Sequence, residues 1–89
     1  MKELAQLRRL VAERQNDILA AVAADLGRHN MEGFLGEVGT TMAELDHTMA
    51  NLKTWMASES VSTPLTVQPG RSYIVKQPKG VALIISPWN

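Results

Sequence analysis

The feature that most constrains this chain is an uninterrupted run of apolar residues at 81–85. A run without polar alternation is typical of a strand buried on both faces, as in a parallel sheet covered by helices. A parallel strand needs a neighbour, which the chain reaches through a crossover of a dozen or more residues. No similar run precedes this one, and only residues 86–89 follow it. We therefore predict an α/β fold of which these 89 residues are a fragment.

The first segment, residues 2–26, is predicted to form one long helix because it contains neither Pro nor Gly. Its apolar residues recur at steps of three, four or seven, which places them on one face of a helix: Leu4, Leu7, Val11, Ile18 and Val22. Gly27 follows as a residue that adopts the left-handed conformation of a helix end without a steric penalty.

A second helix is predicted up to about residue 57, with Asn30 as candidate N-cap. Its apolar residues alternate steps of three and four, as in a heptad seam: Leu35, Val38, Met42, Leu45, Met49, Leu52 and Met56. Glycines at 33, 36 and 39 each weaken the first turns by about 1 kcal/mol relative to Ala. This start is therefore either frayed or held by tertiary contacts. We expect the helix to pack on the first one as a helical hairpin; the alternative is coiled-coil pairing.

A change of character after Ser58 predicts a β-hairpin. The stretch from Ser58 to Pro64 is rich in Ser and Thr and ends the helix. Two short β-prone stretches follow at 65–68 and 71–77, with Pro69 and Gly70 between them as a turn. L-Pro-Gly fits a two-residue hairpin badly, so a bulge or a longer loop is expected.

The composition excludes several classes of function. The formal net charge is zero, which argues against a nucleic-acid partner. The chain has no Cys, which excludes a disulfide scaffold, a thiolate metal site and a cysteine nucleophile within these residues. No apolar run approaches the roughly 20 residues of a membrane span, and the amino end does not resemble a signal peptide. We expect a cytoplasmic protein without a membrane segment.

Few residues of the chain are candidates for metal binding or catalysis. Glu44 and His47 lie three residues apart, as in di-metal helical bundles, but such a site needs two of these pairs. We therefore predict no metal site, and we expect His47 to face solvent. No glycine-rich phosphate loop, nucleophile elbow or acid/base pair is present.

The residues after the apolar run occupy the place where ligands bind in open α/β sheets, beyond the carboxyl end of a strand. Pro87 restricts the backbone, Trp88 offers an apolar wall, and the Asn89 amide can donate a hydrogen bond to an oxyanion. The alternative is a polar turn that merely ends a strand.

The stretch that begins at Pro78, Gly80 and Val81 and ends in Pro-Trp-Asn resembles a motif of the aldehyde dehydrogenase superfamily. Stretches that precede this motif resemble other parts of the family's sequence and occur in the same order. Residues 23–27 resemble the family's Ala-x-Asp-Leu-Gly-Lys helix end, with Arg28 in the Lys position, and Glu37 and residues 44–55 resemble its next helix. Residues 69–72 resemble the linking hairpin. The resemblance covers the whole chain, most closely in the fatty and coniferyl aldehyde dehydrogenase branch, and only the first part of that family's sequence.

This resemblance implies NAD(P)-dependent oxidation of aldehydes to carboxylic acids. It assigns Asn89 as the catalytic oxyanion donor, and it places Ile85, Ser86, Pro87 and Trp88 along the cleft for NAD or NADP. The nucleophilic Cys and the general-base Glu belong to later sequence, so these residues alone are expected to be inactive. A homo-oligomer, a dimer in this branch, is the expected assembly.

The resemblance also implies an organisation into three parts. Residues 1–63 would form the helical part of a Rossmann-like cofactor-binding domain, with two long helices. Residues 64–78 would form a β-hairpin of the oligomerisation region, and residues 79–89 the first buried strand of the cofactor-binding domain. A different class of function stays open: a non-catalytic helical hairpin that serves as an interaction module.

Overall fold

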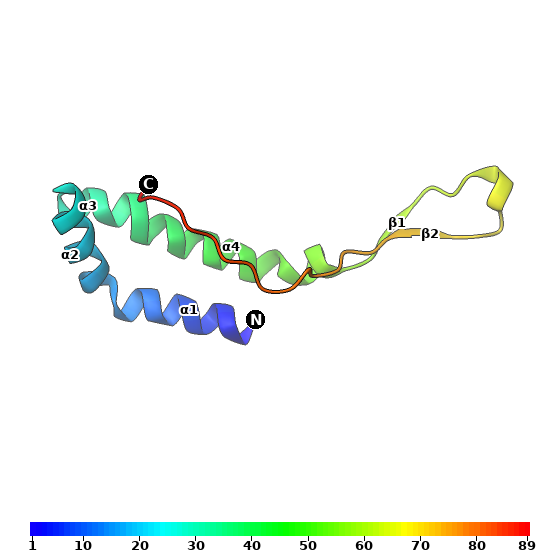
Figure 1. The fold of residues 1–89 in the computed structure, drawn as a ribbon. Coiled ribbons are helices and arrows are strands. Elements are labelled where there is room, and N and C mark those ends of the chain that lie inside the picture. The colour runs from blue at the N-terminus through cyan, green and yellow to red at the C-terminus, as the bar shows by residue number, and fades with distance from the viewer. The chain divides into compact units, whose positions relative to one another are not determined.

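A computed structural model describes all residues from 1 to 89, and its chain falls into two compact units. The first unit comprises Met1–Ala50 with Ile84–Asn89, and the second comprises Asn51–Leu83. The elements are four helices and two short strands (Figure 1): α1 Lys2–Glu13, α2 Gln15–Leu26, α3 Asn30–Gly33, α4 Gly39–Met56, β1 Glu59–Val61 and β2 Ser72–Ile74. A π-helical turn, Phe34–Val38, joins α3 to α4, and a 3-10 turn, Leu65–Val67, lies between the strands.

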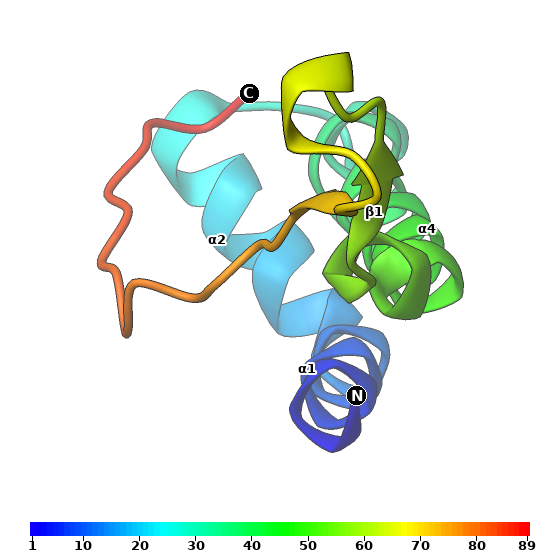
Figure 2. The same ribbon diagram turned by 90° about the vertical axis from the view of Figure 1, so that its right-hand side faces the viewer.

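The predicted single helix over residues 2–26 is wrong, because the chain bends at Arg14 and forms α1 and α2 instead. Figure 2 shows α1 nearly end-on with α2 inclined to it. The cause is tertiary packing: Leu19 and Val22 of α2 are buried and α2 contacts α3, whereas α1 buries no residue. Gly27 ends α2 with φ 66°, as predicted, and its N–H donates to the Ala23 carbonyl at 2.8 Å.

The second helical segment begins at Asn30, and its N-cap is His29 rather than Asn30. The His29 ring nitrogen Nδ1 accepts the N–H of Met31 at 3.3 Å, so the predicted N-cap is wrong by one residue. Gly33 is buried, and a Cβ there would lie 3.2 Å from Leu19 Cδ2. The absence of a side chain thus lets α3 approach α2 closely, and tertiary contacts hold the glycine-containing start of this segment.

The core of the first unit consists of four buried apolar side chains: Leu19, Val22, Val38 and Leu45. Val38 and Leu45 belong to the predicted seam, whose outer members Leu35 and Met56 are exposed. The two helical segments therefore pack on each other through α2, the π-helical turn and α3. No helix combines the length and the apolar character that a bilayer crossing demands.

A charged contact links α1 to α4. The Arg8 guanidinium donates to both carboxylate oxygens of Asp46: Nε donates to Oδ1, and Nη2 donates to Oδ2 at 3.0 Å. The hydrogen bond from Arg8, together with the attraction of its positive charge, lowers the pKa of Asp46. Both side chains remain partly exposed to solvent. The pair is therefore a solvent-exposed link between the two helices and not a buried contact.

The hairpin forms with different strands from those predicted. Strand β1 pairs antiparallel with β2, with Glu59 opposite Ile74, Ser60 opposite Tyr73 and Val61 opposite Ser72. The stretch predicted as the first strand, 65–68, contains the 3-10 turn, and the second strand is shorter than predicted. Prolines at 64 and 69 flank that stretch and lack the N–H that a ladder needs. The long connection between the strands agrees with the expected longer loop.

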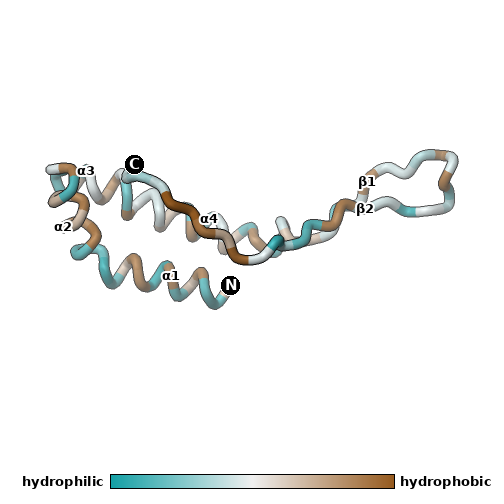
Figure 3. The backbone as a smooth tube through the Cα atoms, viewed as in Figure 1, coloured by the Kyte–Doolittle hydropathy of each residue, from teal (hydrophilic) through white to brown (hydrophobic).

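The predicted buried strand at 81–85 is not formed. Val81, Leu83, Ile84 and Ile85 are each at least 84% exposed, and Figure 3 shows the apolar stretch before the C-terminus in brown. The physical reason is pairing: the strands of the structure, β1 and β2, pair with each other in a separate two-stranded sheet. A strand buried on both faces requires a sheet around it, and these residues do not supply one.

Candidate functional site

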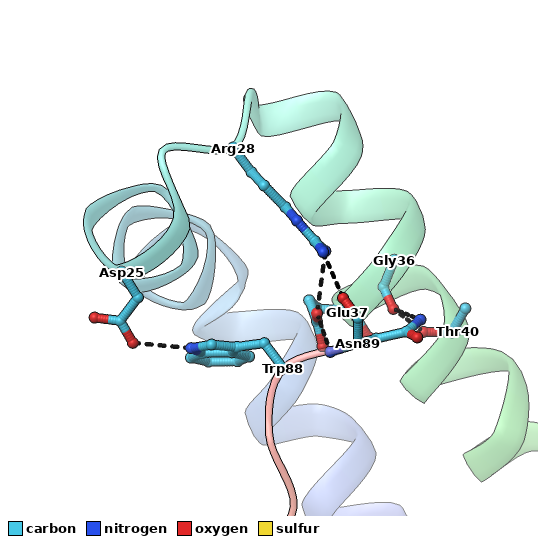
Figure 4. Close-up of polar contacts among 7 residues, drawn as sticks. All are labelled: Asp25, Arg28, Gly36, Glu37, Thr40, Trp88 and Asn89. Carbon is cyan, nitrogen blue, oxygen red and sulfur yellow. Dashed lines mark hydrogen bonds and ion pairs between the residues drawn. The ribbon is translucent and has the colours of Figure 1, made fainter.

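The last residues of the chain lie against the start of the second helical segment, within the first unit (Figure 4). The Trp88 indole N–H donates to Asp25 Oδ2, near the end of α2, at 2.8 Å. Asn89 contacts residues of the π-helical turn. The chain thus brings its Pro-Trp-Asn motif onto both helical segments.

Asn89 is bound through its backbone N–H, its backbone carbonyl and its side-chain NH2 group. Its backbone N–H donates to Glu37 Oε1 at 2.8 Å, and its side-chain Nδ2 donates to the Gly36 carbonyl at 3.0 Å. Its backbone carbonyl accepts a hydrogen bond from Arg28 Nη2. We call Arg28, Gly36 and Glu37 the Asn89 clamp. It restrains both the backbone and the side chain of Asn89.

Charge complementarity holds the clamp together. The Glu37 carboxylate is only 14% exposed, and Arg28 Nη1 lies 3.4 Å from its Oε1. The same oxygen receives the Asn89 N–H, so Glu37 accepts two donors at one atom. A carboxylate removed from water is stable when hydrogen bonds and an opposite charge compensate it.

The π-helical turn makes the Gly36 carbonyl available to side chains. A π-helix shifts backbone bonding from i−4 to i−5, and the Gly39 N–H accordingly donates to the Phe34 carbonyl. The Gly36 carbonyl accepts the Thr40 hydroxyl at 2.7 Å in addition to the Asn89 amide. A Cβ on Gly36 would lie 3.3 Å from Arg28 Nη1, so a glycine keeps this space open. Such π-turns are frequent at functional sites.

A pocket of about 550 Å³ adjoins the clamp, between α4 and residues 86–89. Its lining carries hydroxyl groups of Thr40, Thr48 and Ser86 and carboxylates of Glu37 and Glu44. Neither a thiol nor a basic side chain lines it. The hydroxyl and carboxylate groups of the lining can form hydrogen bonds with the neutral hydroxyl groups of a ligand. They provide no positive charge that would attract a phosphate.

The structure brings four of the five predicted site residues to this region. Ser86, Pro87 and Asn89 line the pocket, and Trp88 binds Asp25 beside it. Ile85 is 88% exposed and does not line the pocket. No group of three His, Asp or Glu side chains is arranged to hold a metal ion.

Residues that the sequence reasoning did not treat as functional complete the region. Arg28 and Glu37 entered only as part of a family resemblance, and Asp25 in the same way. The sequence contains one pattern that indicates this contact. Arg28 precedes α3 and Glu37 follows it, and the glycines at 33, 36 and 39 leave room for another segment to approach.

Comparison with known proteins gives a uniform result. The sequence profile described as "Aldehyde dehydrogenase family" matches residues 1–89. The chain is 41% identical over 87 residues to "Aldehyde dehydrogenase family 3 comG" of Dictyostelium discoideum, which covers 98% of this chain and 18% of that protein. It is 42% identical over 89 residues to "Aldehyde dehydrogenase family 3 member A2" of Macaca fascicularis, covering 100% of this chain and 18% of that protein.

A bacterial relative shows the same relationship. The chain is 36% identical over 88 residues to "4,4'-diaponeurosporen-aldehyde dehydrogenase" of Staphylococcus aureus, covering 99% of this chain and 19% of that protein. The chain therefore spans less than a fifth of the length of these curated relatives.

Proposed function

This chain belongs to the aldehyde dehydrogenase family, and from that premise we propose that it is the amino-terminal region of an NAD(P)-dependent enzyme that oxidises aldehydes to carboxylic acids. The observation that carries the proposal is the match of the family profile over residues 1–89. The 18% share of each relative supports the expectation that further sequence supplies the nucleophilic Cys and the general-base Glu. These 89 residues contain no Cys.

Asn89 is proposed as the oxyanion donor. When a cysteine thiolate adds to the aldehyde carbon, the carbonyl oxygen becomes an anion that needs a positioned hydrogen-bond donor. An Asn amide has two N–H donors, of which the Gly36 carbonyl takes one. This bond also determines which end of the amide is the nitrogen, since only the nitrogen can donate to a carbonyl. The second N–H is the group assigned to the oxyanion.

The residues before Asn89 are proposed to line the NAD or NADP cleft. The hydroxyl of Ser86 and the rigid ring of Pro87 face a pocket whose polar groups suit the sugar hydroxyls of a dinucleotide. No basic side chain lines this pocket, and we propose that later sequence binds the pyrophosphate. The bound dinucleotide supplies the chemistry of a hydride acceptor. Ile85, Ser86, Pro87 and Trp88 would contribute one wall and its orientation.

The organisation of the whole protein follows the same proposal. Residues 1–63 and 79–89 would belong to a Rossmann-like cofactor-binding domain, in which 81–85 joins a parallel sheet. The hairpin, predicted at 64–78 and paired here through Glu59–Val61 and Ser72–Ile74, would join the oligomerisation sheet of a homodimer. A cytoplasmic location remains part of the proposal.

The test is kinetic and uses the complete enzyme. Asn89→Ala should lower turnover by roughly a hundredfold or more, because the lost donor acts mainly in the transition state. Affinity for NAD should change much less. Asn89→Asp should be at least as damaging, since a carboxylate repels the developing negative charge. Near-normal turnover of folded Asn89→Ala would refute the assignment.

A control uses the 89 residues alone. This chain should produce no NADH with any aldehyde, because it has no thiol to add to the carbonyl. NADH formation by the purified chain, with contaminating enzyme excluded, would contradict the proposed division of roles.

A further inference from the structure

The Asn89 clamp has a role beyond holding the end of a segment. An oxyanion donor is effective only when it is already oriented before the charge develops, because reorientation in the transition state costs free energy. Asn89 follows Trp88, whose indole N–H donates to Asp25 Oδ2 at 2.8 Å. The contacts that act on Asn89 directly come from the Gly36 carbonyl, which accepts from its side-chain amide, and from Glu37 and Arg28, which bind its backbone.

Glu37 is the central contact of the clamp. Its Oε1 receives the Asn89 N–H at 2.8 Å and lies 3.4 Å from Arg28 Nη1. Arg28 in turn donates through Nη2 to the Asn89 carbonyl. Arg28 and Glu37 therefore bind the two backbone groups of Asn89 from either side and also bind each other. This closed arrangement restrains the Asn89 backbone, and the Gly36 carbonyl restrains its amide at 3.0 Å.

We propose that Glu37, supported by Arg28, is a positioning residue for aldehyde oxidation: it holds the backbone of Asn89 so that the amide stays oriented toward the oxyanion. This inference rests on the proposed function for its catalytic part, whereas the contact itself does not depend on it. Glu37 also lines the pocket proposed for the cofactor, but its role in this proposal is the contact with the Asn89 backbone. It acts through Asn89.

The prediction for activity concerns turnover rather than cofactor binding. In the complete enzyme, Glu37→Ala should lower kcat by roughly tenfold to a hundredfold, because small misplacements of a catalytic group have effects of this size. Because Glu37 also lines the pocket proposed for the cofactor, the KM for NAD separates the two roles: a change of less than about twofold is expected if Glu37 acts through Asn89, and a rise in KM that matches the loss in kcat would overturn the proposal. Glu37→Gln keeps an acceptor for the Asn89 N–H but loses the charge that binds Arg28. It should therefore retain more activity than Glu37→Ala.

A double-mutant cycle separates positioning from general structural support. If Glu37 acts through the Asn89 amide, Glu37→Ala should cost less than about twofold in an Asn89→Ala background. Equal losses in both backgrounds would overturn the proposal. Glu32→Ala serves as the matched control, since Glu32 is an exposed glutamate of α3 outside the clamp. It should leave kcat unchanged.

A second readout is independent of activity. In the 89-residue chain, the backbone amide proton of Asn89 should resonate downfield and exchange slowly, because it is bonded to a carboxylate. Glu37→Ala should shift that signal upfield and accelerate exchange, whereas Glu37→Gln and Glu32→Ala should preserve much of the protection. An unmoved signal in Glu37→Ala would refute the clamp. An inactive complete enzyme with an intact clamp signal would instead refute the proposed function and, with it, the catalytic role of Glu37.

Discussion

The two units of the chain differ in how many apolar side chains each of them buries. The unit of residues 1–50 and 84–89 contains all four buried apolar side chains of the protein, whereas the unit of residues 51–83 contains none. In the second unit Leu65 is 91% exposed and Leu83 is 84% exposed. Its regular elements are the end of α4, the strands β1 and β2 and the 3-10 turn between them.

The difference shows what each kind of element needs from its surroundings. A helix forms its hydrogen bonds within one segment, so α2 and α4 require only a partner for one apolar face. A strand forms its bonds with another strand, and an isolated two-stranded hairpin is marginal in water. The helical unit therefore carries a small core of its own, while the hairpin and the apolar stretch at 81–85 depend on structure elsewhere for burial.

The largest expected effect on stability is in the helical core. Val22 is fully buried, so Val22→Ala should lower the free energy of unfolding by about 2–3 kcal/mol through lost burial and a residual cavity. Val67→Ala is the matched control, because Val67 is 56% exposed in the other unit and should change stability by less than about 0.5 kcal/mol. Urea unfolding followed by far-UV circular dichroism measures both. Equal effects would contradict the difference between the units.

A smaller effect is expected for Gly70→Ala in the hairpin connection. A Cβ at this position would lie 2.6 Å from the Val67 carbonyl oxygen, which forces the backbone to shift. The strain, about 1–2 kcal/mol, exceeds what a marginal hairpin tolerates. Cross-strand NMR contacts between Ser60 and Tyr73 should disappear. The helical dichroism should remain, and its loss would show that the two units are not independent.

The smallest effect is the pH dependence from Arg8 and Asp46. Because the folded-state pKa of Asp46 is lowered, its contribution to stability is complete above the unfolded pKa of about 3.9 and is lost as the pH falls through the folded value. Asp46→Asn should therefore be less stable than the wild type near neutral pH, and the difference should vanish in acid. Added salt should reduce it, since both groups are partly exposed. A difference that persists in acid would exclude the ion pair as its cause.

The sequence predicted local features well where one segment determines the outcome. The spacing of Val38 and Leu45 identified core positions of the second helical segment, and Gly27 was correctly expected at a helix end. Predictions failed where contacts with residues distant in the sequence determine the local structure. The bend at Arg14 follows from the packing of α2 on α3, and no Pro or Gly signals it.

The site follows the same rule. The Pro-Trp-Asn motif directed attention to Asn89 from sequence alone, but spacing could not pair Asn89 with Glu37, which lies far away in the chain. The roles of Asn89 and of residues 85–88 in catalysis and cofactor binding stay predictions, to be decided by the kinetics described above.

By itself, the sequence determined the family, the two helical segments and the presence of a hairpin, because periodicity, turn residues and motif order are properties of contiguous residues. Tertiary structure alone decided where the first helix breaks, which residues pair in the hairpin and which side chains hold Asn89. Arg28, Gly36 and Glu37 meet Asn89 because the chain folds back onto its π-helical turn. Such contacts depend on the free energy of packing distant segments together, which no local pattern encodes.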